Sequence, residues 1–283
     1  MMQEASARQM PNTEIMPEEV IPEDILSTYQ RISDSYDEIF AGEGEIRTHW
    51  RYFIDSLQKL GSNELERRWQ EAYRLLRDNG VNYSDYYGEA KKNNRPWQLD
   101  PIPMLMSQQE WELIEKGLVQ RAELMSLLFN DLYGERESLR KGLLPIELIA
   151  GHPNFLRPCA KVKQIPRHRL PFYAVDLVRD PNGIIWAMAD RTQMPSGAGY
   201  ALENRLVMSR VLPSLFRDSH VHRLSAFSKA LRSTLASMSN REDHRIVMLT
   251  AGNNYSESSY FEYVYLCQIF GLYASTRWRF DSA

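Results

Sequence analysis

The chain has 283 residues, 43% of them hydrophobic and 25% charged, with a formal net charge of −3. This composition is typical of a globular protein with a sizeable core, and the absence of a basic run argues against a nucleic-acid partner. No apolar run reaches the ~18 residues of a membrane span, so we predict no membrane partner. No apolar leader opens the chain, and the two cysteines, Cys159 and Cys267, have no partner motif, so we predict a cytoplasmic location.

Residues 1–22 are polar and are interrupted by Pro11, Pro17 and Pro22. Such a segment buries too little apolar surface to order itself. We predict a disordered N-terminal arm over 1–22, followed by the folded part of the chain.

Helical periodicity dominates the first half of the chain. One helix is predicted within 43–60 and ends before Gly61. A second helix, capped by the side chain of Ser62 or Asn63, ends before Gly80. Residues 82–103 lack a period and predict an extended connector. The inward faces of the two helices comprise Ile46, Trp50, Phe53, Ile54, Leu57 and Leu60 in the first, and Leu65, Trp69, Ala72 and Leu76 in the second.

A third helix is predicted after Ser107. Ser107 and Glu110 have the spacing of a capping box, in which each side chain bonds the other residue's backbone amide. The apolar residues expected to face inward on this helix are Trp111, Ile114, Leu118, Ala122, Met125 and Phe129.

The pattern changes near residue 171, where two apolar, β-prone runs flank the turn sequence DPNG at 180–183. Proline presets φ and glycine accepts a positive φ, so this sequence predicts a β-hairpin. Helices are expected at about 201–217 and 222–239, a buried strand at 245–251, and a helix after a loop near Ser256 or Glu257. The predicted class is α+β, with a helix-rich first half.

Two aspartates of the hairpin are candidate metal ligands. Asp176 lies in the first strand and Asp190 at the end of the second. If both carboxylates faced one way, they would offer the hard oxygen ligands that Mg²⁺ prefers. From the pattern alone, two solvated aspartates at strand ends are the stronger alternative.

The segment PSGAGYALENR at 195–205 is a candidate anion site. Ser196, Gly197 and Gly199 allow close backbone approach in front of a helix start, where free amides favour anions. Glu203, Asn204 and Arg205 follow early in that helix, and Arg205 could reach a phosphate. No standard phosphate fingerprint is present, and from the pattern alone an ordinary glycine turn is the stronger alternative.

The loop at 250–262 lies between a predicted strand and a predicted helix, where α/β proteins place ligand loops. Glu257 and Tyr260 are its polar candidates for substrate contact. An ordinary loop with a helix cap is an equal alternative.

Several long segments occur in an order that resembles one family. They are RPWQLDPIPMLMSQQEW (95–111), GLLPIELIAGHPNFLRPC (142–159), YAVDLVRDPNGIIWAMADRTQMPSGAGYALENR (173–205), VLPSLFRDSHVHRL (211–224) and MLTAGNNYSESSYFEYVYL (248–266). The chain resembles the circularly permuted ATP-grasp type 2 family, related to glutathionylspermidine-synthase-like ligases. The resemblance implies a partial, circularly permuted ATP-grasp domain over 23–272, with an atypical tail at 273–283.

The family resemblance implies ATP and Mg²⁺ as cofactors and carboxylate–amine ligation through an acyl phosphate. Partners would be carboxylate and amine substrates, and an alpha-E domain protein is a possible further one. The implied roles are metal binding by Asp176 and Asp190, nucleotide binding by Ser196, Gly197, Gly199, Glu203 and Asn204, and catalytic contacts by Arg157 and Arg205.

This chain departs from the resemblance in two places. Ala189 and Arg191 stand where many relatives have Glu and Asn, a form that the subgroup associated with alpha-E domains shares. After Gly271 the sequence no longer matches, and the tail has no strand pattern. The alternative function is therefore a truncated or degenerate member without catalysis, a binding or assembly module or a nonfunctional fragment. Its face toward the missing half would be a large apolar patch.

Overall fold

The computed structural model describes residues 26–27, 29–42, 44–84, 94–160, 170–193, 195–239, 241, 246–249, 260–270 and 273–275. The arm predicted at 1–22 lies outside this range. Helices and two-stranded sheets together give the α+β composition that the sequence predicts. The elements, in chain order, are β1 (Phe40–Gly42), β2 (Glu45–Ile46), α1 (Thr48–Leu60), α2 (Ser62–Asp78), β3 (Asn82–Ser84), β4 (Asn94–Pro96), α3 (Gln108–Tyr133), α4 (Glu137–Arg140), α5 (Ile146–Ala150), the 3₁₀ turn η1 (Arg157–Cys159), β5 (Ala174–Arg179), β6 (Ile185–Arg191), α6 (Ala198–Val211), α7 (Pro213–Asp218), α8 (Ser225–Ser237), β7 (Val247–Leu249), α9 (Tyr260–Phe270) and β8 (Tyr273–Ser275).

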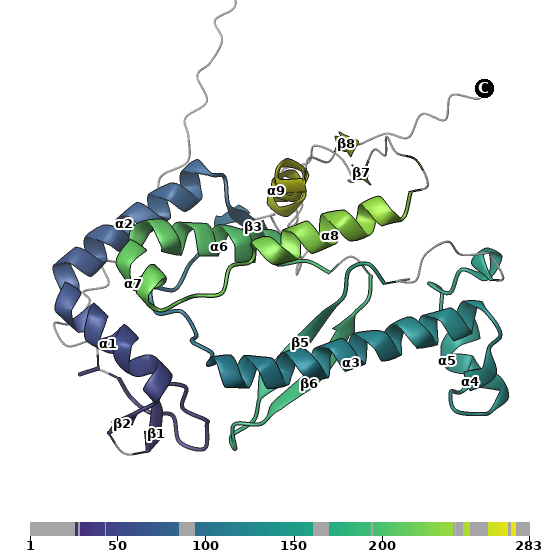
Figure 1. Ribbon diagram of the computed structural model, residues 1–283, viewed down its shortest axis with the longest axis horizontal. Helices are drawn as coiled ribbons and strands as arrows, with labels where there is room; N and C mark the ends of the chain where they lie inside the picture. Colours follow the sequence, from purple (N-terminus) through teal and green to yellow (C-terminus); the bar gives the residue numbers. More distant parts are fainter. Residues whose placement is uncertain are drawn as a thin grey trace, which may run out of the picture.

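The main core is built by α1, α2, α6 and α7, which gather on the left of Figure 1. The period predicted for the first two helices is confirmed from Thr48 onward, because their apolar stripes supply the most buried side chains of the core. Ile46, predicted on the first helix, lies in β2 instead. α6 packs on α2 and adds Tyr200 and Val207 to the core. The buried side chains of α1 and α2 are Trp50, Phe53, Ile54, Leu57, Leu65, Trp69, Ala72 and Leu76.

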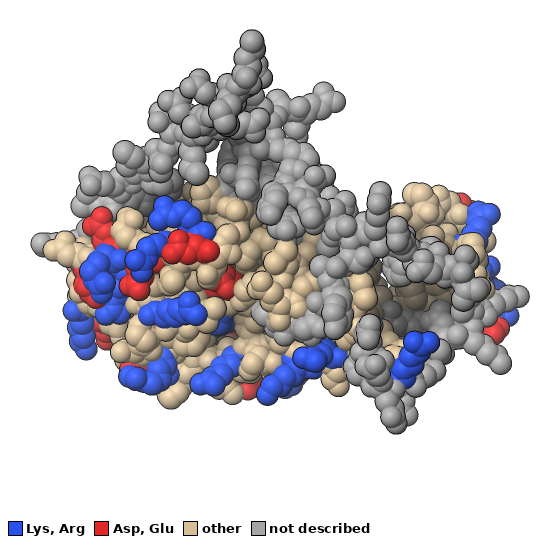
Figure 2. All heavy atoms as spheres, turned by 90° about the horizontal axis from the view of Figure 1, so that it is seen from above, with Lys and Arg blue, Asp and Glu red and all other residues tan. Residues whose placement is uncertain are grey.

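The junction between α1 and α2 is a single glycine. Gly61 has a φ of 77° and serves as both the C-cap of α1 and the N-cap of α2. The predicted side-chain cap at Ser62 or Asn63 is therefore wrong, because both residues lie within α2 and no side chain caps this helix. On its outer face α2 carries the ion pairs of Glu64 with Arg67 and Arg68, and Figure 2 shows acidic and basic side chains intermixed at that end of the molecule.

Helix α3 begins where the sequence predicts. The hydroxyl of Ser107 accepts a hydrogen bond from the Glu110 backbone amide at 3.2 Å, although the Glu110 carboxylate turns to Arg179 instead of completing the capping box. Ile114 is buried, whereas Trp111 is 43% exposed, so the prediction for Trp111 is wrong. The reason is that α3 lies beside a narrow hairpin, which covers only a limited strip of its surface.

The predicted β-hairpin is confirmed as β5 and β6, which pair antiparallel. Its tip is the expected turn, since the Gly183 amide donates to the Asp180 carbonyl at 2.9 Å and Gly183 has a φ of 86°. A register shift between Asp176 and Leu177 bends the hairpin beyond that point.

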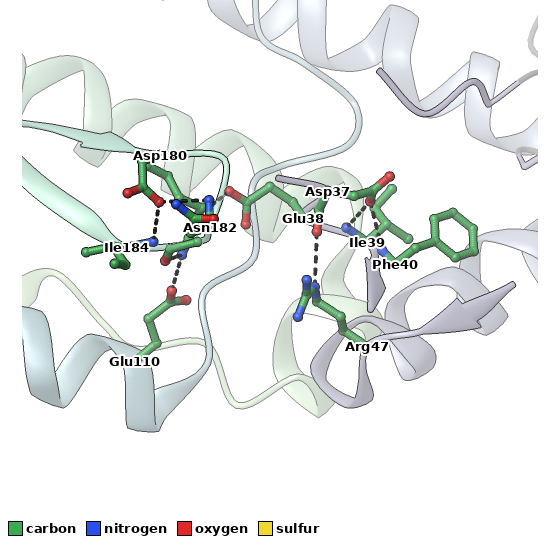
Figure 3. A network of polar contacts seen from close by, with 11 residues as sticks. Asp37, Glu38, Ile39, Phe40, Arg47, Glu110, Asp180, Asn182 and Ile184 are labelled. Carbon is green, nitrogen blue, oxygen red and sulfur yellow. Dashed lines mark hydrogen bonds and ion pairs between the residues drawn. The ribbon is translucent and has the colours of Figure 1, made fainter. Parts of the chain in front are cut away.

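The hairpin tip is fixed to the rest of the chain by Arg179, whose side chain is 8% exposed. Arg179 pairs with Glu38 at 2.6 Å and with Glu110 of α3, and its guanidinium lies 4.7 Å from the Tyr36 ring centroid. Figure 3 shows Glu38 and Glu110 approaching the tip from two separate segments, beside the Asp180 turn. One guanidinium thus holds the hairpin, α3 and the segment before β1 together.

Strand β7 confirms part of the strand predicted at 245–251, and it pairs in parallel with β8. Residues 273–275 of the tail form this strand although the tail has no apolar strand pattern. The sequence of β8 has no apolar alternation, and β8 forms a strand because its backbone pairs with that of β7. Within the described residues, none of the helices combines the length and the hydropathy that a membrane crossing requires.

Candidate functional site

Asp190 clamps the hairpin to α3. Both of its carboxylate oxygens accept hydrogen bonds from Arg121 at 2.7 Å, and Oδ1 also accepts one from the Tyr173 hydroxyl at 2.5 Å. The Arg121 bond is the main cause that lowers the pKa of Asp190. Burial, together with the bond to Asp190, raises the pKa of Tyr173 to about 12. Asp190 is an ionised carboxylate with a bidentate partner.

Asp176 points the other way. It pairs across the hairpin with Ala189, whereas Asp190 pairs with Val175, so the two carboxylates leave opposite faces. Arg191 binds Asp176 at 2.6 Å on the exposed face. The register therefore does not bring the two predicted metal ligands together, and each carboxylate has an arginine partner.

The donor set around these aspartates does not fit Mg²⁺. A magnesium site needs oxygen ligands that converge on one point, and here two guanidinium groups occupy the carboxylates. In the part of the chain that the structure describes, no three His, Cys, Asp or Glu side chains gather as a metal site. Metal binding by Asp176 and Asp190 remains a prediction that the geometry of this chain does not support.

The glycine loop at 195–199 does bind an anion, and the anion is a side chain. The Glu262 Oε1 atom in α9 accepts hydrogen bonds from the backbone amides of Gly197 at 2.7 Å and Gly199 at 2.9 Å. Gly197 has a φ of 114° and is the N-cap of α6. The Glu262 carboxylate thus occupies the position at the start of α6 where the sequence suggested a phosphate.

The fit at this contact is close. A methyl group on Gly199 would lie 2.9 Å from Cγ of Glu262, and Glu262 itself is 1% exposed. The glycine therefore has a packing role: it lets α9 approach the first turn of α6. Ser196, the residue before Gly197, is exposed.

A second buried carboxylate lies one turn further along α6. Glu203 is 1% exposed and accepts a hydrogen bond at 2.5 Å from the side-chain amide of Asn79, the C-cap of α2. Tyr265 of α9 also bonds to Glu203, and burial, followed by the Glu203 charge, raises the pKa of the Tyr265 phenol. Glu203 thereby joins α2, α6 and α9 through polar contacts inside the fold.

Asn204 and Arg205, the other predicted residues of α6, face different surroundings. The Asn204 side-chain oxygen accepts a bond from the Trp97 indole at 2.8 Å. The Arg205 guanidinium lies 6.0 Å from the Phe216 ring centroid, and burial lowers its pKa. A partly buried guanidinium can pair with an anion, whereas the Asn204 side chain already has a structural partner in Trp97.

The remaining predicted residues do not join this group. Arg157 is exposed and donates to the Ala150 carbonyl at 3.1 Å, next to α5. Figure 1 places α5 at the far end of α3 from α6. Glu257 lies outside the described residues. Tyr260 begins α9, and its backbone is the only part of it that the structure describes.

Sequence reasoning missed Glu262, Asn79 and Tyr265. Glu262 had a detectable signal, because it is the one carboxylate in the mostly apolar helix YFEYVYLCQIF, and buried acids are rare unless paired. Asn79 gave no such signal, since an asparagine before a glycine is also typical of an ordinary helix end.

Relatives in several bacteria match this chain over most of its length. An uncharacterized protein of Mycobacterium tuberculosis is 34% identical over 245 residues, which cover 83% of this chain and 28% of that protein. One of Mycobacterium leprae is 30% identical over 244 residues, with coverage of 85% and 42%. One of Synechocystis is 30% identical over 239 residues, with coverage of 84% and 49%. The chain therefore spans less than half the length of each.

The family described as circularly permuted ATP-grasp type 2 matches residues 103–274. This range is more than half of the chain, and it includes the β5–β6 hairpin, the glycine loop, α6 and α9. Both buried carboxylates, Glu203 and Glu262, fall within it. The chain belongs to the circularly permuted ATP-grasp type 2 family.

Proposed function

We propose that this chain is part of an ATP-dependent carboxylate–amine ligase. In such a reaction a substrate carboxylate attacks the γ-phosphorus of ATP and ADP leaves. An amine then attacks the resulting acyl phosphate, so that an amide forms and inorganic phosphate leaves. Membership of the ATP-grasp family over residues 103–274 is the observation that carries the proposal.

Within this proposal, the first turn of α6 lies at the edge of the nucleotide site. The Ser196 hydroxyl is exposed there, and Arg205 offers a partly buried positive charge on the same helix. The Gly197 and Gly199 amides bind Glu262, so a phosphate could use them only after that carboxylate moved. We assign these amides a structural role, and leave the phosphate contacts to Ser196 and Arg205.

A second candidate is a module that assembles with another polypeptide and has no catalysis of its own. Both hairpin aspartates, the predicted metal ligands, are bound by arginine side chains, and this favours a chain without a metal site of its own. Since Asp176 and Asp190 do not converge, no step of the reaction is assigned to a metal ion held by this chain.

Thermal unfolding of the full chain with ATP and Mg²⁺, each in excess, separates the two candidates. A ligand that binds the folded state raises the melting temperature by about 2–4 °C for each kcal/mol by which it stabilises that state. The ligase proposal expects a rise for the wild type and its loss in Arg205→Ala, with no loss in the control Arg210→Ala, an exposed arginine of the same helix. No rise with ATP, ADP or a nonhydrolysable analogue would leave the assembly module as the function of the isolated chain.

A further inference from the structure

The β5–β6 hairpin is attached to the rest of the chain by charged contacts. Every residue from 174 to 191 is described, and none of their apolar side chains is buried. The hairpin is bound to α3 through Asp190 near its base and through Arg179 near its tip. A unit with few buried apolar contacts can open locally while the core stays folded.

A β-bulge divides the hairpin into two halves. The residues paired with Asp176 and Leu177 are not adjacent, because Met188 lies between them as an extra residue. A bulge interrupts the ladder of hydrogen bonds and lets the strand bend. We call residues 177–187 the tip half, and residues 174–176 with 189–191 the base half. Asp190 lies in the base half and Arg179 in the tip half, so each half has its own contact with α3.

Tyr36 is at the centre of the contacts around the tip half. Two guanidinium groups lie close to its ring, since the Cζ atoms of Arg47 and Arg179 are 4.3 Å and 4.7 Å from the ring centroid. The ring also packs on the turn, because a Cβ on Gly183 would lie 2.5 Å from the Cε2 atom of Tyr36. Glu38, two residues later, binds Arg179 at 2.6 Å. The segment before β1 therefore covers both the side chain and the turn that end the hairpin.

Asp37 gives this segment a fixed shape. Its carboxylate accepts hydrogen bonds from the backbone amides of Ile39 and Phe40 at 2.9 Å and 2.8 Å, and its carbonyl accepts one from Arg47 Nε at 3.1 Å. Figure 3 shows the Glu38 side chain directed toward the hairpin turn and the Asp37 side chain directed away from it. Tyr36 and Glu38 are thus held in position on either side of a buried aspartate.

We infer that residues 36–40 form a strap that holds the tip half of the hairpin against α3, and that the tip half bends away at the bulge when the strap is released. The base half stays in place, because Arg121 binds both carboxylate oxygens of Asp190 without any contact from the strap. Arg179 is 8% exposed, and a guanidinium that has lost a carboxylate partner is more stable in water than in that position.

The strap lies outside the range that matches the family, residues 103–274, whereas the hairpin lies inside it. A segment that precedes the family region therefore controls the freedom of an element within that region. The inference involves no nucleotide contact, so it is independent of the ligase proposal.

Amide hydrogen exchange of the full chain, followed residue by residue, tests the inference. Tyr36→Leu removes the ring and Glu38→Gln removes the charge that Arg179 binds. In each variant the tip-half amides should exchange about tenfold faster or more, while the amides of the base half and of α2 keep their rates. Tyr36→Phe keeps the ring and should restore the rates of the wild type. Glu45→Gln, an exposed change in the neighbouring β2, is the matched control for Glu38→Gln.

Trp186 offers a second, local measurement. Its indole Nε1 atom donates a hydrogen bond to Asp180 Oδ2 of the turn at 3.0 Å. In protein labelled with 5-fluorotryptophan, release of the strap should shift or broaden the ¹⁹F signal of Trp186, which Trp186→Phe identifies. The signal of Trp69 in the main core should not change. A general loss of stability would not act on Trp186 alone.

Unchanged exchange in the tip half of Tyr36→Leu would overturn the inference. An increase of equal size in the tip half, the base half and α2 would also overturn it, because the strap would then contribute only to global stability. If Tyr36→Leu does not fold, Glu38→Gln gives the same test with a smaller change of volume.

Discussion

The carboxylate of Glu262 accepts hydrogen bonds from the amides of both Gly197 and Gly199. One side chain of α9 therefore satisfies two of the free amides at the start of α6, and its negative charge lies at the positive end of that helix. The two helices are joined by a contact that is buried, charged and specific in geometry.

Substitution of Glu262 should loosen this junction. Glu262→Gln keeps an acceptor oxygen but removes the charge, and we expect a loss of about 1–2 kcal/mol in the free energy of unfolding. Urea denaturation measures the loss, and hydrogen exchange should show faster exchange at residues 197–199. The exposed Glu123→Gln change in α3 is the control. An unchanged stability in Glu262→Gln would show that the contact contributes little.

Glycine 199 should not tolerate even one methyl group. A Cβ there would lie 2.9 Å from Cγ and 3.4 Å from Cα of Glu262. We expect Gly199→Ala to cost about 1–3 kcal/mol, the usual range for overpacking. The matched change Gly117→Ala lies within α3 and meets nothing within 4 Å, so it should stabilise the chain by about 0.5–1 kcal/mol through helix propensity. If the two substitutions shift the urea midpoint in the same direction, the packing argument is wrong.

Asn79 and Tyr265 should act together through Glu203. Asn79→Ala and Tyr265→Phe each remove a hydrogen bond to a buried carboxylate, and each should cost about 1–3 kcal/mol. Because they share one partner, the double variant should depart from the sum of the single variants by more than about 0.5 kcal/mol. A double-mutant cycle by urea denaturation measures this coupling, and strict additivity would contradict a shared role.

The Arg121–Asp190 clamp should give the protein an acid-sensitive contact. The pKa of Asp190 is lowered in the folded state, mainly by the bond from Arg121, whereas an unfolded aspartate titrates near 3.9. The stabilisation is therefore present above about pH 4 and is lost as the pH falls through the folded-state pKa. Asp190→Asn should cost about 1–2 kcal/mol at pH 7, and its difference from the wild type should shrink below about pH 4. Urea denaturation at pH 7, 5 and 3 checks the trend, and a difference that is constant with pH would contradict it.

The sequence predicts the elements whose signals are local. The apolar period of α2, the Ser107 cap of α3 and the DPNG turn each depend on residues within a few positions of one another, and all three are confirmed. The family resemblance, which rests on long ordered motifs, is confirmed as well.

Contacts between distant segments are the part that the sequence could not supply. The metal hypothesis required Asp176 and Asp190 to share a face, and a register that pairs Asp190 with Val175 puts them on opposite faces. The anion at the glycine loop is a glutamate more than sixty residues away in the chain. Strand β8 has no strand pattern in its own sequence and depends on pairing with β7, so local signals could not predict it.

The parallel pairing of β7 with β8 also has a consequence for how the protein is made. The ribosome must synthesise α9 and reach Ser275 before Leu249 can meet its partner. At about 5–20 residues per second, translation leaves β7 without that partner for roughly 1–5 seconds. Formation of the β7–β8 pair is therefore a late event that cannot begin before α9 has been made.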